Sequence, residues 1–64
     1  MELKRVIIYP KDIQRITGKS ERYGRKLIRD IKDHLHKDDH QMVTIYEFSE
    51  YSGIDTELIK QYLD

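Results

Sequence analysis

The chain has 64 residues and no cysteine, and its twelve Lys or Arg residues balance twelve Asp or Glu. This length permits one domain near the lower limit for folding without help, and the lack of cysteine excludes internal disulfides and thiolate metal sites. No apolar run approaches the roughly 18 residues of a membrane span, and no start resembles a signal peptide. We therefore expect a soluble, cytoplasmic protein that makes no membrane contact.

The first predicted elements are a short extended segment and a short helix. Residues 6–9 form a β-branched and aromatic run, which is either a short strand or a segment packed over the core. Pro10 suits the first helical position because it lacks only an N–H that would be unpaired there, and Asp12 suits the first turn. Gly18 can take the positive φ that often ends a helix. The sequence thus predicts a helix over residues 10–17.

A longer amphipathic helix is predicted over residues 20–37. Ser20 can accept a hydrogen bond from a free backbone N–H of the first turn, which makes it a suitable N-cap. At helical spacing the apolar side chains share one face, which we expect to be buried, and the cations share the opposite face. The apolar face comprises Tyr23, Gly24, Leu27, Ile28, Ile31 and Leu35. The other face, called the basic face below, comprises Arg22, Arg25, Lys26, Arg29 and Lys32.

This order of helix, Gly turn, Ser cap and second helix resembles the helix-turn-helix DNA-binding superfamily. The resemblance covers residues 12–28 and is carried by Ile13, Thr17, Gly18, Lys19, Ser20, Tyr23, Gly24 and Leu27. Three residues depart from the family pattern: Gln14 replaces a small residue, Lys19 an apolar one, and Gly24 a Val, Ile or Ala. The chain also loosely resembles excisionase-like and MerR-like proteins. The resemblance implies that the second helix lies in the major groove of double-stranded DNA.

The resemblance and the basic face together indicate which residues would contact DNA. Arg22 and Arg25 would lie nearest the bases, while Lys26 and Arg29 would contact phosphates. Residues of the first helix and the turn would hold the flanking backbone. The full predicted set is Lys11, Arg15, Lys19, Ser20, Arg22, Arg25, Lys26, Arg29 and Lys32.

Residues 44–63 repeat this architecture at a spacing of 35 residues. Gly53 repeats Gly18, and Thr44 with Glu47 three residues later forms a capping box. The positions that correspond to the basic face are mostly acidic or neutral in this second copy, so a phosphate backbone would favour the first copy. If one copy binds DNA, it is therefore the first.

The predicted fold is a small all-α domain over residues 1–64, built from two tandem helix-turn-helix units with four helices. Residues 10–37 form the basic unit and residues 44–63 the acidic unit. The fold leaves room for a minor two-stranded element where residues 6–9 and 42–45 meet. The predicted function is DNA binding, as in a small transcriptional regulator or an excisionase-like architectural factor.

The charge distribution also supports an alternative function. Residues 1–32 hold ten Lys or Arg against four Asp or Glu, a net +6, and residues 33–64 hold two against eight, a net −6. Such asymmetry indicates a nucleic-acid surface or a protein partner, or it means that the two halves attract each other. The alternative is a protein-interaction module that forms a homodimer or docks on an acidic protein partner.

Other chemistry finds little support in the sequence. His34, His36 and His40 lie among aspartates, but their spacing does not match a four-ligand zinc site, so we expect no metal or other cofactor. No Cys nucleophile, phosphate-binding glycine loop or Gly-flanked serine is present, so we expect no enzymatic activity. We interpret four tyrosines as core or rim residues rather than as base-stacking residues. These are Tyr9, Tyr46, Tyr51 and Tyr62.

Overall fold

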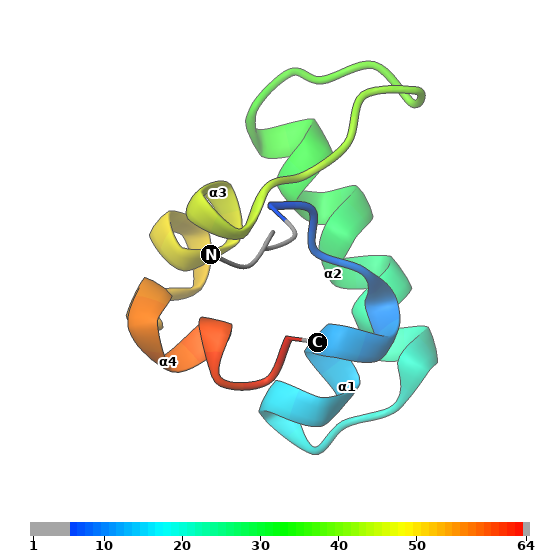
Figure 1. Ribbon diagram of the computed structural model, residues 1–64. Helices are drawn as coiled ribbons and strands as arrows, with labels where there is room; N and C mark the ends of the chain where they lie inside the picture. Colours follow the sequence, from blue (N-terminus) through cyan, green and yellow to red (C-terminus); the bar gives the residue numbers. More distant parts are fainter. Residues whose placement is uncertain (1–5, 64) are drawn as a thin grey trace.

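The computed structural model describes residues 6–63, and four helices occur in that range (Figure 1). They are α1 (Pro10–Thr17), α2 (Glu21–His34), α3 (Ile45–Ser52) and α4 (Thr56–Lys60). α1 packs against α2, α3 packs against α4, and α2 also contacts α3. The predicted small all-α domain of two helix pairs is confirmed. No helix in the described range is both long enough and apolar enough to cross a bilayer.

Both units contribute side chains to one core. Its buried apolar residues are Ile8, Ile13, Ile31, Val43, Ile45, Phe48 and Ile59. Partly buried residues pack around them, namely Ile16, Leu27, Ile28, Ile54 and Leu63. The two helix pairs therefore stabilise each other, because apolar surface from each unit is removed from water by the other.

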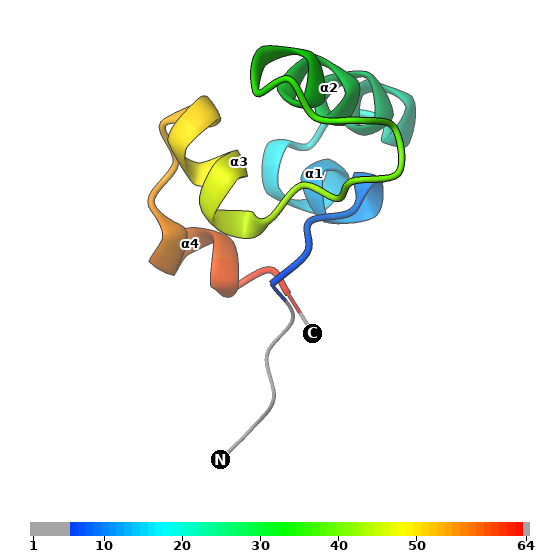
Figure 2. The same ribbon diagram turned by 90° about the horizontal axis from the view of Figure 1, so that it is seen from above.

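The extended segments that precede α1 and α3 lie side by side, as both views show (Figures 1 and 2). Ile7 and Thr44 form a single antiparallel bridge. The Ile8 N–H donates to the Val43 carbonyl oxygen at 3.0 Å. Within residues 6–63 the expected two-stranded element is therefore reduced to one bridge and no strand forms.

The 35-residue repeat is visible in the two turns. Gly18 has a φ of 77° and its N–H donates to the Gln14 carbonyl at 2.8 Å. Gly53 has a φ of 80° and its N–H donates to the Ser49 carbonyl at 2.9 Å. Both glycines end a helix in the left-handed conformation, which a residue with a Cβ adopts only at a cost.

The predicted helix caps also form. The Tyr23 N–H donates to Ser20 Oγ at 3.1 Å, so Ser20 caps α2. At α3 the Glu47 N–H donates to Thr44 Oγ1 at 3.1 Å, and the Thr44 N–H donates to Glu47 Oε1 at 2.9 Å. This reciprocal pair is the capping box expected from the sequence.

α2 ends at His34, three residues earlier than predicted. His36 has a φ of 60°, and the Lys37 N–H donates to the Lys32 carbonyl at 2.8 Å. These features close the helix in the manner of a Schellman motif, with His36 in the position that glycine usually occupies. The sequence gives no signal for this end because no glycine is present there.

Replacing His36 with Gly should therefore stabilise the protein. In the left-handed region, a residue with a Cβ is less stable than glycine by about 1–2 kcal/mol. Replacement by glycine recovers only part of this energy, because glycine loses more conformational entropy when the chain folds. We expect His36→Gly to raise the free energy of unfolding by about 0.5–1 kcal/mol, measured by urea denaturation. His36→Ala removes the imidazole but keeps the Cβ, so it should give no such gain. Equal gains in both variants would contradict the backbone explanation.

Two residues of the predicted apolar face are not buried. Tyr23 is 38% exposed and Leu35 is 40% exposed. Tyr23 belongs to the first turn of α2 and Leu35 is its C-cap, so both lie at the ends of the helix. Helical spacing gives the direction of a side chain but not the extent of the neighbouring helices, and for this reason the prediction was wrong at both ends.

At Gly24 the backbones of α1 and α2 come close together. A Cβ placed on Gly24 would lie 2.6 Å from the Pro10 carbonyl oxygen and 3.0 Å from the Pro10 Cα. The absence of a side chain lets the first turn of α1 rest on the backbone of α2. The departure of Gly24 from the helix-turn-helix pattern thus has a structural reason in this chain.

Candidate nucleic-acid interface

The basic face follows the outer side of α2. Arg22, Arg25, Lys26 and Arg29 are exposed, and Lys32 is half-buried. The opposite side of the helix is fixed by buried Gly24 and Ile31. α2 has 14 residues and is about 21 Å long. Its four exposed cations form a rigid row, in which Arg22 and Arg29 are about two helical turns apart.

Two cations of this row have acidic partners within the same helix. Arg25 Nη1 lies 3.2 Å from Glu21 Oε2, and Lys26 Nζ lies 3.2 Å from Asp30 Oδ2. Such solvent-exposed pairs are worth little, so a phosphate can replace the carboxylate at small cost. Among residues 6–63, no ion pair joins the row to the acidic second half.

Arg22 and Arg29 differ from these two residues. Within the described residues neither forms an ion pair or a hydrogen bond. They are seven residues apart, about 10 Å along one side of the helix. Two exposed guanidinium groups on one line are therefore available for an external anion.

Two predicted contact residues are instead used inside the fold. Lys32 Nζ donates to the Asp39 carbonyl at 2.7 Å, which ties the loop after α2 to the helix. Arg15 Nη1 donates to the Tyr62 carbonyl at 3.2 Å and lies 4.0 Å from Asp12 Oδ1. The sequence could not indicate the two hydrogen bonds, because their acceptors are backbone carbonyls that only the fold brings close; the Arg15–Asp12 pair, in contrast, is a local contact three residues apart.

The remaining predicted residues flank the row. Lys11 is exposed on α1. Lys19 is exposed in the turn, and its Nζ lies 5.6 Å from the centroid of the Tyr23 ring, within the range of a cation–π contact. Ser20 is exposed, and its Oγ already accepts the capping hydrogen bond. The row, the turn and the start of α1 thus offer cations on three consecutive elements.

The second unit presents a different surface. In α4, Lys60 Nζ lies 3.8 Å from Glu57 Oε2, so the unit's exposed cation already faces an acid. Several large apolar or aromatic side chains of this unit are also exposed, at 41–54%: Tyr46, Tyr51, Leu58 and Tyr62. These tyrosines and Tyr9 are rim residues, and the core alternative is wrong for them. The exposed side chains of the second unit are thus mostly acidic, aromatic or apolar rather than basic.

An ion pair joins the loop after α2 to α3. Lys37 Nζ lies 3.0 Å from Glu47 Oε2, and both side chains are partly buried. Burial raises the pKa of the Glu47 carboxyl, but the hydrogen bond from the Thr44 backbone N–H and the nearby Lys37 ammonium lower it. The lowering effects are larger together, so the pKa of Glu47 lies below its ordinary value. The pair holds the second unit to the end of the basic helix.

The histidines do not gather into a metal centre. In the part of the chain that the structure describes, no three His, Cys, Asp or Glu side chains come together as ligands. The His34 ring instead meets the Tyr51 ring edge-on, with centroids 5.4 Å apart. This contact packs the end of α2 against α3.

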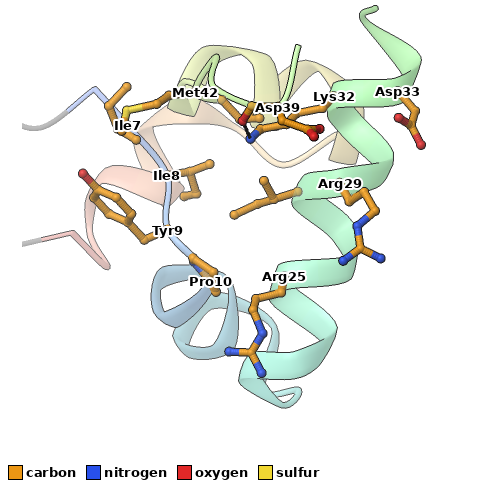
Figure 3. Close-up of a pocket in the computed structure, with 12 residues that line it drawn as sticks. Ile7, Ile8, Tyr9, Pro10, Arg25, Arg29, Lys32, Asp33, Asp39 and Met42 are labelled. Carbon is orange, nitrogen blue, oxygen red and sulfur yellow. Dashed lines mark hydrogen bonds between the residues drawn. The ribbon is translucent and has the colours of Figure 1, made fainter. Parts of the chain in front are cut away.

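A groove that the sequence did not reveal lies beside the basic face (Figure 3). It is open to solvent, has a volume of about 490 Å³, and separates α2 from the extended segments that precede α1 and α3. Arg25 and Arg29 belong to both the basic face and the wall of this groove. Its lining comes from three separated stretches of chain, which no local pattern could bring together.

Comparison of the chain with protein-family models, curated proteins and solved structures gives no match.

Proposed function

We propose that the protein binds double-stranded DNA and places the basic face of α2 in the major groove. The observation that carries this proposal is the pair Arg22 and Arg29, exposed on one line of α2 without a partner in residues 6–63. DNA affinity comes mainly from Lys and Arg that neutralise phosphates, and a rigid helix that follows a Gly turn is a common means of presenting them. The resemblance to helix-turn-helix proteins supports the same assignment.

The residues divide into two roles in this proposal. Arg22 and Arg25, near the start of α2, lie nearest the base edges, where arginine pairs best with guanine. Lys26 and Arg29 meet phosphates, and Lys11 and Lys19 hold the flanking backbone. Arg15 and Lys32 contribute charge while remaining bonded within the fold. The biological role would be that of a small transcriptional regulator or an excisionase-like architectural factor.

A titration of labelled mixed-sequence duplex DNA, followed by fluorescence anisotropy at several salt concentrations, tests the proposal. Each phosphate neutralised contributes about −0.9 to the slope of log K against log salt, so about five contacts predict a slope of about −4 to −5. Non-specific dissociation constants on the order of 10⁻⁶–10⁻⁴ M are expected near physiological salt. Absence of binding at about 50 mM salt, where such contacts are strong, would overturn the proposal.

The alternative is a protein-interaction module, and the surface of the second unit favours it. Tyr46, Leu58 and Tyr62 are exposed at 54%, 51% and 45% on an acidic background, and aromatic side chains are enriched in protein interfaces. The basic half of one copy could dock on this surface of another. Sedimentation at low and high salt without DNA separates the two functions: association that weakens with salt supports head-to-tail docking, and a monomer under both conditions excludes it.

A further inference from the structure

The groove beside α2 combines an apolar floor with cations on one wall. Its volume of about 490 Å³ lies within the range of roughly 300–1,000 Å³ that is typical of small-molecule sites. Figure 3 shows α2 on one side and the segment from Ile7 to Pro10 on the other. The groove is therefore large enough for a small ligand and open enough for it to enter.

The floor and one end of the groove are apolar. Ile8 and Val43 are buried at its base, and Ile28 is half-buried beside them. Ile7 and Met42 line the upper end, where Met42 is 55% exposed. A flexible methionine over an apolar floor adapts to the shape of an apolar ligand, which would remove this surface from water.

The charges in the groove are separated along its length. Arg25 extends from α2 toward Pro10, and Arg29 follows one turn later on the outer side of the helix (Figure 3). Asp39 lies near Met42, and Asp33 lies farther along α2 and points outward. Arg29 has no ion pair or hydrogen bond in residues 6–63, and Arg25 Nη1 pairs with Oε2 of the solvent-accessible Glu21 at 3.2 Å. Lys32 is held by the Asp39 carbonyl. The two guanidinium groups therefore belong to the Pro10 end of the groove, whereas the Met42 end holds the Lys32 ammonium together with two carboxylates.

We propose that this groove binds an amphipathic carboxylate, a single anionic head on an unbranched apolar body. The carboxylate would accept hydrogen bonds from the guanidinium groups of Arg29 and Arg25, in the geometry that arginine favours. The apolar body would lie over Ile28 and under Met42. An inorganic phosphate or a nucleotide phosphate matches the cations but leaves the apolar floor uncovered. At the Met42 end, Asp33 and Asp39 outnumber Lys32, so this end disfavours a second negative charge.

Such a ligand would compete with DNA, and this consequence rests on the proposed function. Arg25 and Arg29 cannot pair with a ligand carboxylate and with phosphates at full strength at once, so each partner should weaken the other reciprocally. The binding of the carboxylate itself does not depend on DNA. A direct binding experiment without DNA therefore keeps the two proposals distinguishable.

The experiment is a two-dimensional NMR titration of the protein with decanoate below its micelle concentration, with decyltrimethylammonium as the probe of opposite charge. We expect a dissociation constant on the order of 0.1–1 mM for decanoate, given the small number of ligand atoms. The methyl signals of Ile7, Ile28 and Met42 should shift, while Ile59, in the other half of the core, should not. Decyltrimethylammonium should give no saturable shift at these methyl groups.

Three variants complete the test. Arg29→Gln should weaken decanoate binding about tenfold, because it removes the charged donor. Met42→Gln should weaken decanoate binding about threefold to fivefold, because it removes apolar contact with the ligand. The side chain of Met42 is exposed, so this substitution should not destabilise the fold. Arg22 does not line the groove. Arg22→Gln should therefore leave decanoate binding unchanged while it lowers the affinity for DNA. Equal binding of both probes, shifts confined to α3 and α4, or no effect of Arg29→Gln would each overturn the proposal.

Discussion

The double variant Arg22→Gln/Arg29→Gln should bind a mixed-sequence duplex about 100-fold more weakly than the wild-type protein at about 50 mM salt. Each phosphate contact contributes about a factor of ten at that salt, because counterions are released when a cation meets the DNA. The slope of log K against log salt should flatten by about 1.8. Neither arginine has a partner in the described residues, so no carboxylate of residues 6–63 is left unpaired in the variant.

Lys60→Glu provides the matched control for this prediction. It changes the net charge by −2, as the double variant does, but acts on α4 of the acidic unit at the position that corresponds to Arg25. The substitution removes only the weak, solvent-exposed ion pair between Lys60 and Glu57. We expect DNA affinity within about threefold of wild type, since only the long-range field changes. Equal losses in the control and the double variant would show that net charge, rather than the basic face, determines binding.

Replacing Gly24 with Ala should lower the free energy of unfolding by about 1–2 kcal/mol. The new Cβ would lie 2.6 Å from the Pro10 carbonyl oxygen, and both partners are backbone, so α1 must move away from α2. Overpacking of this kind costs about 1–3 kcal/mol or more, and the better helix propensity of alanine returns at most about 1 kcal/mol. For a domain of this size, whose total stability is about 3–5 kcal/mol, the loss is a large fraction.

Urea denaturation followed by circular dichroism measures this loss, with Arg25→Ala as the control. Arg25 is the next residue of the same helix and is exposed, so its replacement should change stability by no more than about 0.5 kcal/mol. If Gly24→Ala instead stabilised the protein by about 1 kcal/mol, helix propensity alone would govern the site. The close contact between α1 and α2 would then not be required for the fold.

Local signals were sufficient for most of the helix boundaries. Pro10, Ser20 and the Thr44 capping box each act on the nearest turn of backbone, so their effects could be predicted without the tertiary structure. The glycines at 18 and 53 acted in the same local way. The end of α2 could not be predicted, because His36 takes a conformation for which its residue type has no strong preference.

Features that depend on distant contacts could not be predicted in the same way. The spacing pattern grouped Tyr23 and Leu35 with buried residues, but exposure depends on where the neighbouring helices end. No local pattern indicates that Lys32 and Arg15 donate hydrogen bonds to backbone carbonyls, because those carbonyls come close only in the folded chain. The groove beside α2 likewise arises from segments that are far apart in the sequence. The row of Arg22, Arg25, Lys26 and Arg29 was predictable because one helix carries it.

Mapping by NMR of the backbone amides that shift when duplex DNA is added tests the DNA interface most directly. We predict that the largest shifts occur along the exposed side of α2 from Ser20 to Arg29, with smaller shifts at Lys11 and Lys19. Amides of α3 and α4 should change little, and added salt should reverse the shifts. Shifts centred on Tyr46, Leu58 or Tyr62, with α2 unaffected, would contradict the assignment of the basic face as the DNA-binding surface.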